Sequence, residues 1–340
     1  MNSFGMLFRI SIFGESHGEC VGITIDGCPA GLPLTAEDML PDLERRKGGQ
    51  GKGTTPRKED DYPLIKSGVF NGMTTGFPIT ILFENKNTRS EDYDKQRSIP
   101  RPGHADWVAH QKFGGHEDYR GGGHFSARLT TGIVAAGAIA KKLLMLGVSY
   151  HGETSPLTIQ AFVTEIGGDN NLEQGLQKAI DAKDSVGGLV ECRVSGLPVG
   201  LGEPYFDSLE SALAHIVFAI PAVRGIEFGT GFAAAKMFGS EHNDAIEDME
   251  GTTRTNHAGG VVGGISNGNE LVFRLAVKPT SSTPKEQNSL NWETGTTEDF
   301  TIKGRHDLCV ALRAPVIVEA VTAIVLADFM LLHQQIKRVL

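Results

Sequence analysis

Hydrophobic and polar residues alternate over short stretches in the N-terminal part of the chain. Two apolar runs, LFRISIF and VGITID, stand on either side of the polar turn GESHGEC within residues 4–26. Alternation with a period of two indicates half-buried β-strands, and a short glycine-containing turn between two such runs is typical of neighbouring strands. The same criteria predict further strands at residues 67–70, 79–84, 157–166, 189–194 and 270–277.

Longer apolar patterns predict five helices. Residues 35–46 begin with Thr35 as a candidate N-cap and carry acidic residues in the first turn. Residues 127–147 are rich in small residues and end at Gly147, a candidate C-cap. The remaining helices are expected at residues 172–183, 207–220 and 316–334.

Two segments are apolar enough to be tested as membrane spans. Residues 131–140 are too short, since a span needs about 20 apolar residues. Residues 314–332 contain Glu319 and Asp328, each of which costs about 2.5–3.5 kcal/mol at the centre of a bilayer. Both segments are therefore expected to be buried helices, and no membrane partner is expected.

Two long stretches without clear periodicity, residues 85–126 and 239–269, separate these elements. Loops longer than about 12–15 residues are usually functional or disordered. No proline- or serine-rich linker divides the chain into halves. A single α+β domain over residues 1–340 is therefore expected.

Composition narrows the classes of function. The chain has 32 Lys and Arg against 41 Asp and Glu, a net charge of −9, which disfavours a general nucleic-acid binder or a membrane-surface protein. Four cysteines without a CxxC pair fit a reducing compartment. Because no basic and then apolar leader precedes the first strand, a cytoplasmic location is expected.

Residues 45–58 carry a local excess of positive charge in this acidic chain. Arginine side chains and glycine-flanked amides suit phosphate and carboxylate groups, whereas a bare run of charges is also typical of a solvated loop. The segment is not a P-loop, because Arg46 and Gly53 stand where GxxxxGK[ST] requires Gly and Ser or Thr. The six cations are Arg45, Arg46, Lys47, Lys52, Arg57 and Lys58.

Histidines form a second group of candidates. Four of the eleven lie within residues 104–124, at intervals that match neither HExxH nor a zinc-finger spacing, so no metal site is expected. His17, His104 and His306 lie in turns beside charged residues, where a group that titrates near neutral pH suits acid–base catalysis. A structural or surface role is an equally open interpretation for each of them.

Two loops have the composition of anion sites. RGGGHFSAR at residues 120–128 runs into a predicted helix, whose N-terminal amides attract anions, and KPTSS at residues 278–282 offers one cation and three hydroxyls. A plain turn is the alternative for each. Ser16 in GESHG formally matches the Gly-x-Ser-x-Gly of hydrolases, but a strand pattern follows it in place of a helix, which disfavours that class.

Together these segments resemble the chorismate synthase family over essentially the whole chain. The motifs that carry the resemblance are GESHGECVGITIDGCPAG, DLERRKGG followed by TTPRKE, RPGHAD, DYRGGGHFSAR, NHAGGVVGGIS, KPTSS and GRHDLCVALRAPVIVEA. The resemblance implies an α+β fold of the layered β-α-β sandwich type. It also implies a carbon–oxygen lyase of the shikimate pathway, which converts 5-enolpyruvylshikimate 3-phosphate to chorismate and phosphate by an anti-1,4-elimination.

The resemblance further implies a cofactor, an assembly and catalytic residues. The cofactor is reduced FMN, kept reduced by NAD(P)H or by an external flavin reductase, and the usual assembly is a homotetramer. His17 would be the acid near the leaving phosphate. His104 would lie near flavin N1 and Asp307 near flavin N5. Ser16 and Ser126 would act as relays to the two histidines.

Ligand-binding residues are implied in the same way. The phosphate and two carboxylates of the substrate would meet Arg45, Arg46, Lys52 and Arg128. In many family members Arg-Ser stands where this chain has His124-Phe125, and Arg where it has Lys52. A flavin-binding protein without the elimination, such as a flavin reductase, and an anion-binding module without chemistry are the alternatives. The FMN contacts would be His124, Phe125, Ser126, Ala222, Gly263, Lys278, Pro279, Thr280, Ser281, Ser282 and Arg305.

Overall fold

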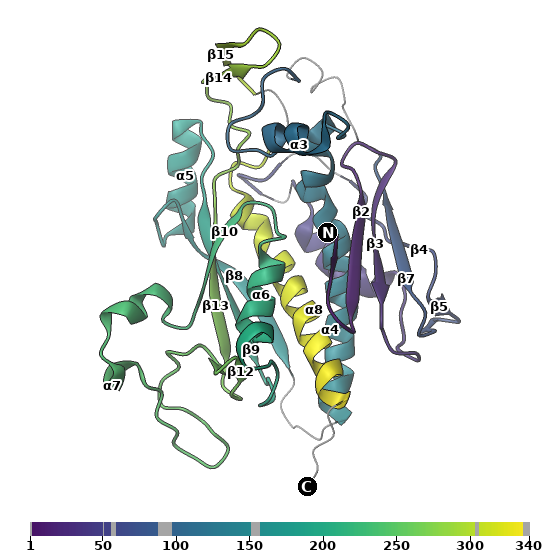
Figure 1. Ribbon diagram of the computed structural model, residues 1–340, viewed down its shortest axis with the longest axis vertical. Coiled ribbons are helices and arrows are strands. Elements are labelled where there is room, and N and C mark those ends of the chain that lie inside the picture. The colour runs from purple at the N-terminus through teal and green to yellow at the C-terminus, as the bar shows by residue number, and fades with distance from the viewer. Residues whose placement is uncertain are drawn as a thin grey trace.

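Two antiparallel sheets enclose a layer of helices (Figure 1). The computed structural model describes residues 2–49, 51–55, 59–87, 97–150, 157–302 and 306–335. In the middle layer, α4 (Thr130–Tyr150) and α8 (Ala314–Gln335) pack side by side, α4 against the first sheet and α8 against the second. This arrangement confirms the expected α+β class and its β-α-β layering. The extent of a single domain, residues 1–340, stays a prediction.

The first sheet has the strand order β1-β2-β3-β7-β4. Its strand β7, between β3 and β4, alternates strictly, with Ile79, Ile81 and Phe83 fully buried against the helical layer. The period-two pattern in the sequence therefore predicts the buried face of this sheet correctly. The strands are β1 (Ser3–Phe4), β2 (Arg9–Gly14), β3 (Cys20–Asp26), β4 (Leu64–Ile65) and β7 (Ile79–Glu84).

The second sheet has the order β10-β13-β9-β8, and α6 packs on α8 beside it. Three further two-stranded hairpins are β5 with β6, β11 with β12, and β14 with β15. The strands of the second sheet are β8 (Thr158–Ile166), β9 (Gly188–Ser195), β10 (Val223–Phe228) and β13 (Leu271–Val277); those of the hairpins are β5 (Val69–Phe70), β6 (Met73–Thr74), β11 (Val261–Val262), β12 (Ile265–Ser266), β14 (Gln287–Asn291) and β15 (Thr296–Phe300).

Small residues let the two central helices approach closely. A Cβ atom added to Gly137 of α4 would lie 2.3 Å from the Cβ of Ala320 of α8. The small-residue run of residues 131–140 is therefore a packing surface. One described stretch, Val310–His333, is long and apolar enough to cross a bilayer, but 83% of its most apolar window is buried inside the molecule. This finding confirms that residues 314–332 form a buried helix.

The remaining helices are shorter and surround the central pair. Single 3-10 turns lead into several of them, and these turns are labelled η. The α-helices are α1 (Leu40–Arg46), α3 (Asp106–Phe113), α5 (Leu172–Ala182), α6 (Leu209–Val217) and α7 (Gly239–His242); the 3-10 turns are η1 (Glu37–Met39), η2 (Arg120–Phe125), η3 (Ala127–Leu129), η4 (Tyr205–Asp207), η5 (Gly231–Lys236) and η6 (Val310–Arg313).

Some predicted boundaries are wrong. Gly147 is not a C-cap, because α4 continues to Tyr150. The Thr35 side chain does not cap η1; instead, the Asp38 carboxylate accepts a hydrogen bond from the Thr35 backbone N–H at 2.8 Å. The long stretch of residues 85–126 contains α3, whose only buried residue, Ala109, leaves too weak an apolar pattern to predict a helix. Strand β10 and the hairpin β14–β15 were likewise not predicted.

Candidate active site

A cleft of about 520 Å³ opens at the end of the helical layer where α4 and α8 begin. Its walls come from segments far apart in the sequence: the turn after β2, the end of α1, the loop before α3, turns η2 and η3, the segment between α6 and β10, and the segment after β13. Both central helices point their N-termini, the positive ends of their dipoles, at this cleft (Figure 1). The volume lies in the range of small-molecule and cofactor sites.

The cleft is cationic although the protein is acidic. Among the described residues, its lining includes six cations and three carboxylates, in a chain whose net charge is −9. Together with the two helix N-termini, this excess of positive charge favours an anionic ligand. The cations are Arg46, Lys47, Arg101, Arg128, Lys278 and Arg313, and the acids are Glu59, Asp61 and Asp307.

The glycine triplet of η2 brings two of the predicted histidines to one wall. Gly121 and Gly122 have φ values of 61° and 83°, which favour glycine. A Cβ at Gly121 would lie 2.1 Å from Nδ1 of His17, and one at Gly122 would lie 3.1 Å from Cε1 of His104. Only a backbone without side chains can therefore pass between these two rings.

His104 is held by an acid–base cluster within its own loop. Its Nδ1 lies 2.6 Å from Oδ1 of Asp106, and the Arg101 guanidinium donates to both oxygens of that carboxylate at 2.7 and 2.8 Å. Burial by itself raises the pKa of Asp106, but the hydrogen bonds from Arg101 and His104 outweigh it and hold the pKa of this carboxyl well below its usual range. Asp106 is therefore ionised at neutral pH.

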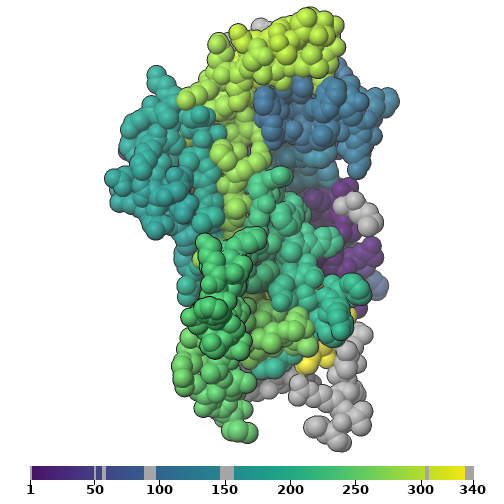
Figure 2. Space-filling view, turned by 60° about the vertical axis from the view of Figure 1, so that its left-hand side comes forward, coloured from purple at the N-terminus to yellow at the C-terminus, as the bar shows by residue number. Residues whose placement is uncertain are grey.

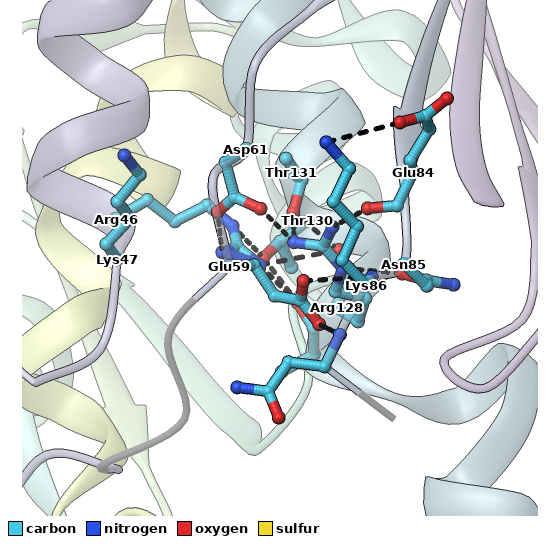
Figure 3. A network of polar contacts seen from close by, with 12 residues as sticks. Arg46, Lys47, Glu59, Asp61, Glu84, Asn85, Lys86, Arg128, Thr130 and Thr131 are labelled. Carbon is cyan, nitrogen blue, oxygen red and sulfur yellow. Dashed lines mark hydrogen bonds and ion pairs between the residues drawn. The ribbon is translucent and has the colours of Figure 1, made fainter. Parts of the chain in front are cut away.

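Arg46 and Arg128 share one carboxylate beneath the cleft (Figure 3). Asp61 accepts from Arg46 at 3.4 Å and also from Arg128, and all three side chains are buried. Burial lowers the pKa of Arg46 to about 9, and Asp61 offsets part of that effect, so that Arg46 stays cationic at neutral pH. Two buried cations against one acid leave a fixed positive charge at this wall.

Asp307 is fixed next to the Arg46 wall through Arg313, whose Nε donates to the Arg46 carbonyl at 2.9 Å. Oδ1 of Asp307 accepts from the Thr55 backbone N–H at 2.8 Å, and Oδ2 accepts from Arg313 at 2.9 Å. The carbonyl of Gly53 accepts hydrogen bonds from the backbone N–H groups of Leu308 and Cys309. The basic segment 51–55 thus docks against the motif that carries Asp307.

The KPTSS segment forms a further wall. Lys278 Nζ donates to the Gly103 carbonyl at 2.9 Å and to Ser281 Oγ at 2.6 Å, and burial, with Arg224 adding to it, lowers the pKa of Lys278. Among the described residues, the Thr280 hydroxyl is buried and has no hydrogen-bond partner. A cation beside hydroxyl groups suits a phosphate ester.

Next to this wall, Ala222 has a φ of 74°, an uncommon backbone conformation for alanine, and its carbonyl accepts from the Lys278 backbone N–H. On the other side of the cleft, His124 Nδ1 lies 2.9 Å from the Gly14 carbonyl, and the Ser126 side chain caps η3 by accepting from the Arg128 N–H. Phe125 also lines the cleft and is 42% exposed.

Most of the predicted site residues line this cleft together. They are Ser16, His17, Arg46, His104, His124, Phe125, Ser126, Arg128, Ala222, Lys278, Pro279, Thr280, Ser281, Ser282 and Asp307.

Four predicted residues are not part of the described lining. Arg45 faces away from it and pairs with Glu319 through two contacts of 2.7 Å, so the structure does not bring it to this cleft. Lys52 is exposed. Gly263 lies in the turn between β11 and β12, away from the cleft of this chain. Arg305 lies outside the described residues.

Sequence reasoning also missed cleft residues. Arg101 lies in RPGHAD and Arg313 in GRHDLCVALRAPVIVEA, and neither arginine is among the predicted site residues of its motif. An arginine a few residues from an acid in the same motif was the available signal. Phe218 had no such signal, because its exposure in the cleft depends on the turn that follows α6.

Comparisons with known proteins identify the family to which the chain belongs. The family model of chorismate synthase matches residues 8–331. The chain is 68% identical, over 100% of its length and 99% of the relative, to a chorismate synthase of Chitinophaga pinensis, and 46% identical over the same shares to one of Dehalococcoides mccartyi. A crystal structure of chorismate synthase aligns with a TM-score of 0.70 and 26% identity, over 97% of this chain and 93% of that one. The chain therefore belongs to the chorismate synthase family of shikimate-pathway lyases.

Proposed function

We propose that this cleft converts 5-enolpyruvylshikimate 3-phosphate to chorismate and phosphate, by an anti-1,4-elimination that requires reduced FMN. The observation that carries the proposal is the excess of cations over acids in the cleft of an acidic protein, with His17 and His104 on the same wall. The substrate has a phosphate and two carboxylates, and such a trianion is attracted by this charge.

Two buried arginines would hold the substrate through their fixed charge. The donors of Arg46 and Arg128 are directed at Asp61 and at neighbouring oxygens of the chain, which keeps both guanidinium groups in place. A preorganised charge of this kind stabilises negative charge that develops as phosphate leaves. Lys52, exposed and next to Gly53, stays a predicted substrate contact.

His17 is proposed to be the acid beside the leaving phosphate. Its side chain is buried and its ring is packed against Gly121. Ser16 precedes it, and the backbone N–H groups of Ser16 and Ser126 both donate to the Gly123 carbonyl; both hydroxyls are proposed to relay protons to the histidines. His104 is proposed to hold a proton next to the cofactor.

The residues of the cleft fit a flavin phosphate. The buried, unpartnered Thr280 hydroxyl, the Lys278 ammonium, Ser281 and Ser282 would take the phosphate or ring oxygens, and Phe125 would offer an aromatic face. Reduced FMN, when bound, supplies electron density to the C–O bond that breaks. Asp307, held by Arg313 and Thr55, is proposed to interact with the flavin ring at its N5 side. His124, Ser126, Ala222 and Pro279 complete the proposed contacts.

An anaerobic phosphate-release assay with photoreduced FMN tests the proposal. Phosphate is expected only when the flavin is reduced. Robust turnover with oxidised flavin, or with none, would contradict the proposed function.

Matched variants separate the alternatives. A flavin reductase without the elimination would oxidise NAD(P)H and release no phosphate. The proposed lyase releases phosphate and loses this activity in His104→Ala and in Asp307→Ala. Phosphate release that both variants leave untouched would refute the proposed roles of these two residues. A protein that only binds anions would release no phosphate, so there would be no activity for His17→Ala to abolish. Whether NAD(P)H or an external reductase reduces the flavin is decided by assaying the purified protein with NAD(P)H and FMN alone.

We also propose the homotetramer that is usual in the family. The segment from η5 to β11 extends away from the layers in Figure 1 and forms the green lobe in front in Figure 2. Large apolar side chains on and near this lobe are more than 75% exposed, which is typical of an interaction surface. Light scattering is expected to give four times the 36.5 kDa subunit, and a monomer would contradict the assembly. These side chains are Tyr205, Phe206, Phe232, Phe238 and Met249.

A cytoplasmic location is proposed as well. All four cysteines are free thiols, and burial raises the pKa of Cys28 to about 11 and that of Cys192 to about 12. Thiols of this kind are compatible with a reducing compartment.

A further inference from the structure

The loop from Arg101 to Asp106 closes on itself through a carboxylate. Oδ2 of Asp106 accepts from the backbone N–H of Arg101 at 3.0 Å and from Arg101 Nε at 2.7 Å. Oδ1 accepts from the other arm of the guanidinium at 2.8 Å and lies 2.6 Å from Nδ1 of His104. Asp106 is the first residue of α3, so the helix fixes the position of its carboxylate.

The ionisation of Asp106 determines the proton position on His104. An ionised carboxylate only accepts hydrogen bonds, so at 2.6 Å the proton must lie on Nδ1 of the imidazole. Nε2 is then the nitrogen that can exchange a proton with a ligand. A Cβ at Gly122 would lie 3.3 Å from this Nε2, and the absence of a side chain at residue 122 leaves the atom uncovered.

We propose that Asp106 is a positioning residue for His104: it fixes the Nδ1–H tautomer, directs Nε2 away from the loop and stabilises the protonated ring. Arg101 holds Asp106 in place and, through a 3.3 Å contact from its second terminal nitrogen to Ser282 Oγ, connects this cluster with the KPTSS wall. The inference rests on the proposed proton role of His104, and it assigns a separate function to a residue that does not itself line the main cleft.

Other charges also act on His104. Arg101 is the nearest of them: its Nη2 lies 3.0 Å from Nδ1 and donates to Oδ1 of Asp106 at 2.8 Å. Lys278 contacts the adjacent Gly103 carbonyl, and Glu117 and Asp118 line a small cavity of about 50 Å³ behind the ring together with Asp106. Glu117 faces His110, with 3.3 Å between Oε1 and Nδ1, and no hydrogen bond or ion pair among the described residues joins it to His104, so it offers a matched control carboxylate in the same cavity.

The test compares Asp106→Asn, Asp106→Glu and the control Glu117→Gln by nitrogen-15 NMR of the histidine rings, with the His104 signal identified from a His104→Gln spectrum. Asp106→Asn is expected to populate the Nε2–H tautomer of His104 in place of the Nδ1–H tautomer, because the Asn amide can donate to Nδ1. Its kcat for phosphate release is expected to fall about 100-fold with little change in KM. Asp106→Glu restores the tautomer and part of the rate, and Glu117→Gln leaves both unchanged.

An unchanged Nδ1–H tautomer of His104 in Asp106→Asn would overturn the inference. A changed tautomer with an unchanged kcat supports the positioning by Asp106 and instead refutes the proton role of His104 in the proposed function. If Asp106→Asn does not fold, Arg101→Lys, which keeps the charge but loses the two-pronged contact with Asp106, is measured in the same way and is expected to populate the Nε2–H tautomer to a smaller extent. An unchanged tautomer in that variant would also count against the inference.

Discussion

Arg45 and Arg46 are neighbours in α1, yet they belong to two different ion networks. Arg45 and Lys141 of α4 share Glu319 of α8, with contacts of 2.7 and 2.9 Å, and Glu319 also accepts from the Ala161 N–H of β8. Arg46 shares Asp61 with Arg128 (Figure 3). The Asp61 network combines one carboxylate with two cations, whereas the Glu319 network has a second carboxylate, Asp42, which contacts Lys141 at 2.7 Å and Arg45 at 3.3 Å.

The two networks differ in burial and in what they face. The Glu319 network connects α1, α4, α8 and β8, and the Arg45 side chain is 48% exposed. The Asp61 network is buried throughout and lines the cleft. Successive residues of a helix point about 100° apart, so one turn of α1 sends one cation to the structural network and the next to the site. Arg45 and Arg46 therefore belong to different networks because of their positions on the helix and not because of their residue type.

The largest effect is expected for Asp61→Asn. This variant leaves two buried guanidinium groups side by side without their common counter-charge, and breaking a buried ion network of this kind costs about 3–5 kcal/mol. Urea denaturation at neutral pH is expected to show a loss of that size in the free energy of unfolding. A loss below about 1 kcal/mol would mean that the network is not essential for stability.

The next effect separates the two arginines by activity. Arg46→Met removes one fixed cation from the cleft, and a charge-assisted interaction of about 1.5–3 kcal/mol corresponds to a loss of about 10- to 150-fold in kcat/KM for phosphate release. Arg45→Met is the matched control, expected to keep kcat/KM within about threefold because Arg45 does not line the cleft. Equal losses in both variants would contradict the division drawn between the networks.

The smallest effect is expected for Glu319→Gln and depends on pH. Burial by itself raises the pKa of Glu319, but Arg45 and Lys141 outweigh it and lower the pKa below its ordinary 4.5. A carboxyl whose pKa is lowered by folding stabilises the protein above that ordinary value and loses this contribution as the pH falls. Wild type is therefore expected to exceed the variant by about 1–2 kcal/mol at neutral pH, a difference that shrinks below about pH 4.5. A difference that grows on acidification would contradict the assignment.

Periodicity predicted the regular elements well where one face is buried. The predicted residues 79–84 match β7, and residues 172–183 differ from α5 only at the C-cap, because Ala179 and Gly175 are buried on one face of a strongly amphipathic helix. The same reasoning failed for α3, which buries only Ala109, and for the hairpin β14–β15, whose sequence is largely polar. Elements stabilised by a few loop contacts leave little periodic signal.

The sequence by itself determined the chemistry available to this protein: an acidic chain with clustered cations, histidines in glycine-rich turns, and motifs that resemble one family in order. Only the tertiary structure decided which of these groups meet. In the folded chain, Arg45 and Arg46 lie in different networks, Arg101 and Arg313 line the cleft, and the Asp106 carboxylate contacts His104. These arrangements depend on contacts between residues that can be hundreds of positions apart in the sequence. Hydrogen bonding and burial fix such contacts only after the chain has packed, so no local pattern of residues encodes them.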